Sequence, residues 1–144
     1  MIGFLKGLFK IKPPVLSSDL QALQAQAESA VRGYLGDGKP FPMFAMAMQA
    51  NGEIVSMLPS EEIPDSREAF AAVVGRLMGL VRDHAIRASV LVTPWEDGGA
   101  HTAVFDLEQR DGGRVLVLLP YRMGPGGVRF EPATTQHAVP KLFA

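Results

Sequence analysis

Two apolar runs joined by a tight polar turn constrain the fold of this chain more than any other feature. The runs cover residues 103–110 and 114–121, and Asp111-Gly112-Gly113 separates them. Strand-forming runs on both sides of a short glycine-containing connection are typical of an antiparallel β-hairpin. The chain is therefore expected to build a mainly antiparallel sheet rather than a parallel one with long crossovers.

The composition indicates one folded domain and excludes several classes of function. The 144 residues are 47% hydrophobic and 20% charged, as in an ordinary globular protein. Their 14 basic and 15 acidic side chains leave a net charge of −1, so we expect no nucleic-acid partner. The lack of cysteine excludes disulfides, thiol catalysis and zinc–thiolate sites. The sequence has no run of about 20 apolar residues and no signal-peptide pattern, so we expect a cytoplasmic protein.

The first twelve residues form a segment distinct from the single domain expected at 16–144. Residues 1–12 place lysines beside an apolar face, and Pro13-Pro14 end any helix that begins there. A helix this short needs a surface on which to fold. The alternatives are this protein or a second copy of it, the groove of a partner, or an anionic membrane. The apolar residues of this expected interaction surface are Phe4, Leu5, Leu8 and Phe9.

Hydrophobic periodicity predicts two long helices. The first begins at Ser18, which has capping-box spacing to Gln21, and ends at Gly36. The second begins at Asp65, which stands three residues before Glu68. The residues expected on the buried faces are Leu20, Leu23, Ala27, Ala30, Val31 and Tyr34, followed in the second helix by Phe70, Val73, Val74, Leu77 and Val81.

The rest of the chain predicts strands. Asn51-Gly52 favours a type I′ turn within a hairpin over residues 41–57. The last stretch, residues 132–144, is expected to be irregular and to pack through Leu142 and Phe143. The later strands are expected at 86–94, 102–110 and 114–121, with a short fourth near 128–131.

These elements predict an α+β domain with the order α-β-β-α-β-β-β. We expect a mainly antiparallel sheet of about five strands with both helices on one face. Polar and apolar side chains alternate along residues 102–110, so the second face is partly solvated there. The neighbouring run at 114–121 is apolar on both faces, and Leu116 and Leu118 need cover from the N-terminal segment, the tail or a second subunit. Leu116 and Leu118 therefore join the expected interaction surface.

Several short motifs occur in the order found in a known family. They are Ile86-Arg87-Ala88, Glu108-x-Arg110-Asp111-Gly112, Leu119-Pro120-Tyr121, Gly127-x-x-Phe130 and Pro140-x-x-Phe143. Over about residues 41–143 the chain resembles a family of small bacterial proteins of unknown function. The resemblance implies a compact α+β domain, and it brings no activity and no catalytic residues.

A loop near one end of the expected sheet carries the side chains best suited to chemistry. Glu96, Asp97 and His101 suit a hard metal ion, together with carboxylates of the strand that follows. We favour a solvated hairpin loop instead, because no ligand spacing matches a known metal site. None of the three histidines lies in a nucleophile motif such as G-x-S-x-G, so we assign no catalytic residue. An alternative small-molecule or metal site would use Trp95, His101, Asp106 and Tyr121.

Two further patterns have a structural and a functional interpretation. Met46 and Met48 face one side of their strand, where thioethers either bind Cu(I) or, as we favour, fill the core. Ala71, Gly75 and Gly79 form a small-residue stripe on the second helix. Such a stripe lets another backbone approach closely, and we expect that backbone to be the protein's own sheet or a helix of a second subunit.

The sequence does not establish a function. The interpretation we favour is a non-catalytic interaction or accessory module that self-associates or binds a protein partner, and it needs no cofactor. One alternative is a small-molecule or metal-binding protein, with or without catalysis, whose site lies near Trp95, His101 and Tyr121. A second alternative is a peripheral membrane protein attached through residues 1–12.

Overall fold

The computed structural model describes residues 15–59, 66–110 and 113–143, which form two helices and seven strands. The α+β class and the mostly antiparallel sheet are confirmed, but the sheet has more strands than the five expected. The elements are α2 (Ser18–Gly36), β1 (Phe44–Gln49), β2 (Ile54–Met57), α3 (Ser66–Arg82), β3 (Ile86–Asp97), β4 (Ala100–Gln109), β5 (Gly113–Gly124), β6 (Gly127–Phe130) and β7 (Thr134–Ala138).

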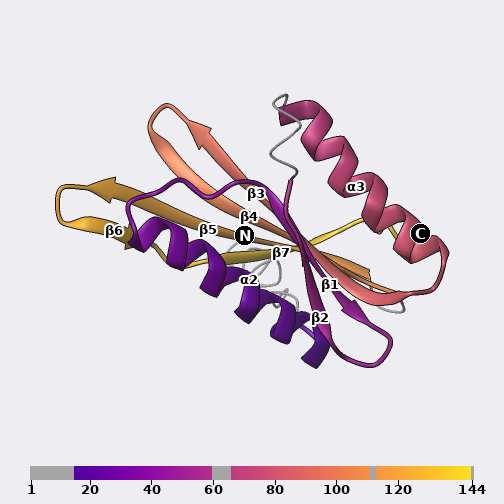
Figure 1. The fold of residues 1–144 in the computed structure, drawn as a ribbon. Helices are drawn as coiled ribbons and strands as arrows, with labels where there is room; N and C mark the ends of the chain where they lie inside the picture. The colour runs from indigo at the N-terminus through magenta and orange to yellow at the C-terminus, as the bar shows by residue number, and fades with distance from the viewer. Residues whose placement is uncertain (1–14, 60–65, 111–112, 144) are drawn as a thin grey trace, which may run out of the picture.

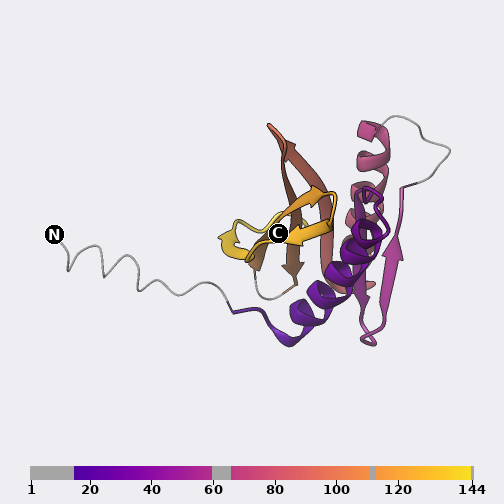
Figure 2. The same cartoon turned by 90° about the vertical axis from the view of Figure 1, so that its left-hand side faces the viewer.

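The described strands form one sheet in the order β2-β1-β3-β4-β5-β6, with β7 also paired to β5. Figure 2 shows β1 and β2 at one side of the sheet and β5 with β6 at the other. The outer edge of β5 is shared, because Tyr121–Gly124 pairs with β6 while Arg114–Leu118 pairs with β7. The expectation of an irregular tail is therefore wrong over Thr134–Ala138, whereas Leu142 and Phe143 do pack against the core.

The two helices lie on opposite faces of the sheet, and the expectation of both on one face is wrong (Figure 1). The reason lies in the central strands, which are apolar on both sides. In β1, Met46 and Met48 belong to the buried cluster under α2, whereas Ala45 and Ala47 belong to the cluster under α3. A strand with two apolar faces needs cover on both. Met46 and Met48 are core residues, as expected.

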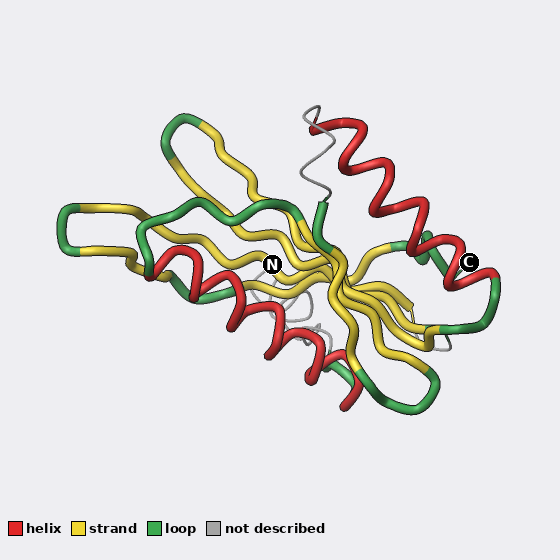
Figure 3. Tube along the Cα trace, in the orientation of Figure 1, coloured by secondary structure: helices red, strands yellow, loops and turns green. Residues whose placement is uncertain are grey.

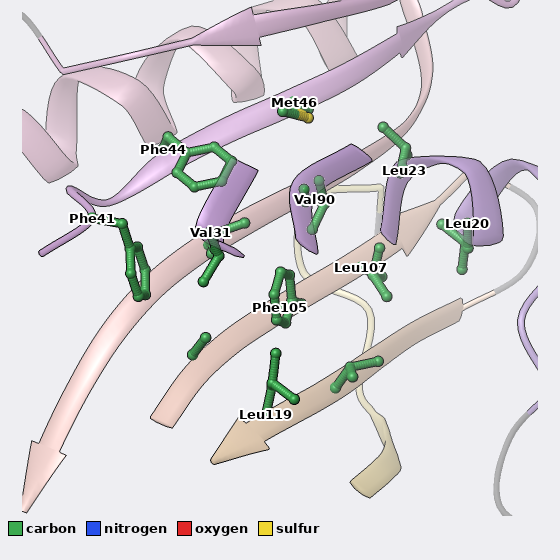
Figure 4. Close-up of a cluster of buried hydrophobic side chains, with 14 of the residues drawn as sticks. Leu20, Leu23, Val31, Phe41, Phe44, Met46, Val90, Phe105, Leu107 and Leu119 are labelled. Carbon is green, nitrogen blue, oxygen red and sulfur yellow. The ribbon is translucent and has the colours of Figure 1, made fainter. Parts of the chain in front are cut away.

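The larger core lies between α2 and the strands from β1 to β5. Figure 4 shows Leu20, Leu23 and Val31 of α2 facing the β4 residues Phe105 and Leu107, and all five are at most 1% exposed. The helix begins at Ser18 as expected, but its N-cap is the preceding residue, Ser17, whose hydroxyl accepts a hydrogen bond from the Leu20 N–H. Neither described helix is long and apolar enough to cross a membrane.

Helix α3 buries Ala69, Val73, Leu77 and Val81 against β1, β2 and β3. Its expected start, Asp65, lies outside the described residues. Phe70 was expected to be buried, but it is 37% exposed. The small-residue stripe does not approach the sheet either, because nothing lies within 4 Å of where a Cβ on Gly75 or Gly79 would stand. The sheet is approached instead by Val73, Leu77 and Val81, each two residues after a member of the stripe and on the other side of the helix.

The first hairpin has a different turn from the one expected. A type I′ turn needs positive φ at both central residues, but Gly52 has φ +91° while Asn51 does not have positive φ. The Gly52 N–H instead donates to the Gln49 carbonyl, and the Gln49 N–H donates to the Glu53 carbonyl. This is a longer loop in which glycine supplies the left-handed position and the Asn51 side chain accepts from the Glu53 N–H.

Candidate functional site

Among the described residues, no helix covers much of β4 and β5 on the α3 face of the sheet. Helix α3 covers β1, β2 and β3, and no residue of β4 or β5 belongs to the buried cluster beneath it. Val104, Leu116 and Leu118 point to this face and are half-buried, and no described helix covers them. We call these three residues the open apolar strip. The structure thus places Leu116 and Leu118 where the sequence predicted them, on a face without full cover.

One end of this face is closed by the C-terminal tail. Glu108 of β4 is only 1% exposed, and its Oε2 accepts hydrogen bonds from the N–H groups of Lys141 (3.0 Å) and Phe143 (2.6 Å). The Arg110 guanidinium lies 5.2 Å from the centre of the Phe143 ring and donates to the carbonyls of Val81 and Ile86. The expectation of a solvated polar face is wrong at Glu108, because the tail buries it.

The open apolar strip is flanked by an ion pair. Arg114 donates to both carboxylate oxygens of Asp106 at 2.8 Å, and both side chains are about one-fifth exposed. The hydrogen bonds that Arg114 donates to Asp106 raise the pKa of Arg114 above its usual value, and partial burial opposes them. Asp106 therefore has its ion-pair partner on the α3 face of the sheet. It does not join the site around Trp95, His101 and Tyr121, contrary to the sequence prediction.

Of the three, His101 and Tyr121 meet on the opposite face, at the far end of the sheet, whereas Trp95 pairs with Thr102 and alternates to the α3 face. Glu96, His101, Tyr121 and Phe130 are direct cross-strand neighbours on β3, β4, β5 and β6. The rings of His101 and Tyr121 stack at 5.2 Å, and those of Tyr121 and Phe130 lie 6.2 Å apart. Period-two alternation on four adjacent strands places these side chains in one row, which we call the aromatic row.

A cleft of about 410 Å³ opens at the Glu96 end of the aromatic row. The loop that follows α2 can be traced in Figure 3, and its residues Gly38, Pro40 and Phe41 line the cleft. Trp95, which is 59% exposed, lies at this cleft. The lining residues are Leu35, Gly38, Pro40, Phe41, Pro94, Trp95, Glu96, His101, Tyr121 and Met123. The cleft is therefore mostly apolar and aromatic, with a few polar groups.

The electrostatics of the cleft are dominated by Glu96, the one charged side chain among its lining residues. Burial of the Tyr121 phenol raises its pKa above 10.0, and the negative charge of Glu96 raises it further. Among the described residues, no group of three or more His, Asp or Glu side chains is arranged to hold a metal ion. The expected carboxylates are divided between the two faces: Glu96 lies at the cleft, whereas Glu108 binds the tail.

Some predicted residues lie outside the described chain, and some important ones were not predicted. Phe4, Leu5, Leu8 and Phe9 are not among the described residues. The role of Arg110 was missed, although this residue belongs to the motifs that suggested the family resemblance. Arg87 of the same motifs binds Asp19 of α2 at 3.1 Å and donates to the Ala50 carbonyl. These motifs therefore hold segments of the fold together.

Comparison with protein-family models gave no match, and neither the curated proteins nor the solved structures gave a significant match. The resemblance to a family of small bacterial proteins therefore stays a prediction. The motif residues have structural roles in this chain whether or not that family includes it.

Proposed function

We propose that this protein is a non-catalytic interaction module that self-associates through the open apolar strip. The observation that carries the proposal is the pair Leu116 and Leu118, which β5 directs to a face without a described helix above it. Val104 of β4 pairs with Leu118 and extends the apolar surface across two strands. Contiguous exposed apolar surface of this kind commonly marks a protein interface.

A second copy of this chain fits the strip for a geometric reason. Two sheets pack face to face about 10 Å apart, and a two-fold axis brings the same patch of each copy together. The strip is flanked by a carboxylate and a guanidinium, Asp106 and Arg114, that are already paired within one chain. A copy packed against the strip would therefore meet little unpaired charge there.

The test is sedimentation analysis of the full chain beside a Leu118→Glu variant. The wild-type chain is expected to form a dimer, and the variant is expected to dissociate at least a hundredfold more readily, because a carboxylate buried in an apolar interface lacks a partner. Circular dichroism and thermal melting establish that the variant is folded. A wild-type chain that sediments as a monomer at all concentrations would rule the proposal out.

Two control variants assign the interface. Met78→Glu places the same charge on the exposed side of α3, where Met78 is 52% exposed, and it is expected to leave the dimer intact. Removal of residues 1–12 tests the N-terminal segment, and it is also expected to leave the dimer intact. If only one of these two controls lost the dimer, the interface would be assigned to the region that this control changes.

The cleft favours small-molecule binding as a second function. Its volume lies within the usual range for ligand sites, and it is mostly apolar with a few convergent polar groups. Metal binding has less support, because no described cluster suits it. Membrane attachment through residues 1–12 stays a prediction. It is tested by salt-dependent binding to anionic liposomes, with the shortened chain as the control.

A further inference from the structure

A positively charged side chain of this protein already lies against one ring of the aromatic row. The Arg32 guanidinium of α2 lies 4.0 Å from the centre of the Phe130 ring, at the end of the row away from Glu96. An aromatic face attracts a cation because its π-electrons carry negative partial charge. At the Phe130 end of the row, the Arg32 guanidinium therefore already occupies the cation–π position.

At the other end of the row, the described residues that line the cleft include aromatic rings and one negative charge but no lysine or arginine. Phe41, His101 and Tyr121 line the cleft from the α2 face, and Glu96 is the one formal charge among the lining residues. Phe41 also packs on Tyr121, with ring centres 6.4 Å apart. The direction of the Tyr121 pKa change is consistent with this charge, because the proximity of Glu96 disfavours a phenolate there.

We propose that the cleft binds a small organic cation with an apolar body, of the alkylated ammonium class. The inference rests on the second function proposed above and names its ligand. Glu96 supplies the opposite charge, and the rings contact the alkyl groups through cation–π attraction. Leu35, Pro40 and Met123 present carbon-rich walls, which suit methyl groups better than they suit the hydrogen-bond donors of a primary amine or a guanidinium.

The size of the cleft fits this ligand class. A volume of about 410 Å³ exceeds that of a tetraalkylammonium head and leaves space for a short polar or apolar extension. The exposed position of Trp95 and Glu96 at the cleft gives the ligand access from solvent. Quaternary ammonium groups are recognised in other proteins by clustered aromatic rings of this kind.

The chain offers a direct readout, because Trp95 is its single tryptophan and it lies at the cleft. The probe is choline, and the comparison compound is 3,3-dimethyl-1-butanol, which has the same shape without the charge. Titration of the full chain with each compound is followed by Trp95 fluorescence and by the amide NMR shifts of His101 and Tyr121. Choline is expected to bind roughly tenfold more tightly than the neutral compound.

Two variants test whether choline affinity depends on the charge of Glu96 itself or only on the net negative charge near the cleft. Glu96→Gln is expected to weaken choline binding roughly tenfold and to leave the neutral compound unaffected. The matched control is Asp97→Asn, which removes the same charge from the next residue, one that does not line the cleft, and should change neither affinity more than twofold.

Each outcome decides between the proposals. Equal binding of choline and 3,3-dimethyl-1-butanol would keep the cleft as a ligand site and overturn the cation inference. Undiminished choline binding by the Glu96→Gln variant would overturn the role of Glu96 and with it the proposal. If neither compound changes the fluorescence or the NMR shifts, both the cation inference and this use of the cleft fail.

Discussion

The α2 face of the sheet is closed by one continuous apolar cluster, whereas the α3 face is closed in separate parts by different means. On the α2 face, buried side chains run from β1 to β5 under a single helix. On the α3 face, a helix covers β1, β2 and β3, and the C-terminal tail covers the end of β4 that carries Glu108. Leu116 and Leu118 lie between these regions and the sheet edge with only partial cover.

The two faces of the sheet are stabilised by different combinations of interactions. Apolar contact on the α2 face is non-directional and scales with buried area, so it stabilises the domain without depending on any one pair of atoms. The α3 face combines a smaller apolar cluster under α3 with directional bonds, such as those from the tail to Glu108 and from Arg114 to Asp106. The first face therefore supplies most of the stability, and the second leaves surface available for a partner.

The largest effect is expected from a truncation on the α2 face. Phe105 is fully buried at the centre of the larger cluster, and Phe105→Ala should lower the free energy of unfolding by about 4 kcal/mol. Leu118→Ala on the open face should cost only about 1 kcal/mol, since Leu118 is half-buried. Urea denaturation of the two variants measures the contrast. Equal losses would show that the open face is covered more fully than the described residues indicate.

The next effect is expected at the tail. Glu108→Ala leaves the N–H groups of Lys141 and Phe143 without their acceptor, which should cost about 2 kcal/mol. Hydrogen exchange of those two amides is expected to accelerate far more than that of Leu107 in the same strand. Glu108→Gln is the matched control, because its carbonyl oxygen still accepts hydrogen bonds and should retain part of the protection. Unchanged exchange in Glu108→Ala would contradict the role of the carboxylate.

The contrast between the faces also explains what the sequence could predict. Local patterns succeeded: the alternation in residues 102–110 placed Ala103, Phe105 and Leu107 on the buried face, where they are fully buried. The start of α2 was also located correctly, because caps and periodicity are local signals. These features depend on residues that lie close together in the chain.

Features that depend on distant contacts were missed. In β1 only Met46 and Met48 were assigned to a face, although the unbroken apolar run also fits a strand covered on both faces. Strand β7 is polar apart from Ala138, so alternation gave no signal, and its pairing with β5 depends on that neighbour. Glu108 looked solvated because the tail that buries it follows more than thirty residues later.

Alkaline pH is expected to weaken the α2 face selectively through Tyr121. Burial, reinforced by Glu96, raises the pKa of this phenol above 10.0, so the unfolded chain loses the proton at a lower pH than the folded chain does. Stability from this group is fully present below pH 10.0 and falls as the pH rises through and above that value. Urea denaturation across this range measures the loss, and Tyr121→Phe should make the profile flatter. An identical slope in the variant would contradict the assignment.

The smallest effect, and the one with the opposite sign, is expected from a polar residue on the α3 face. Ser89 of β3 is fully buried, and its hydroxyl has no hydrogen-bond partner among the described residues. A buried hydroxyl without a partner loses its hydration without compensation, so Ser89→Ala should raise the free energy of unfolding by up to about 1 kcal/mol. Thr93→Ala, at a half-buried position of the same strand, is the control and should not stabilise the protein. If Ser89→Ala is destabilising instead, the hydroxyl has a partner, and the α3 face contains one more directional bond than the described residues reveal.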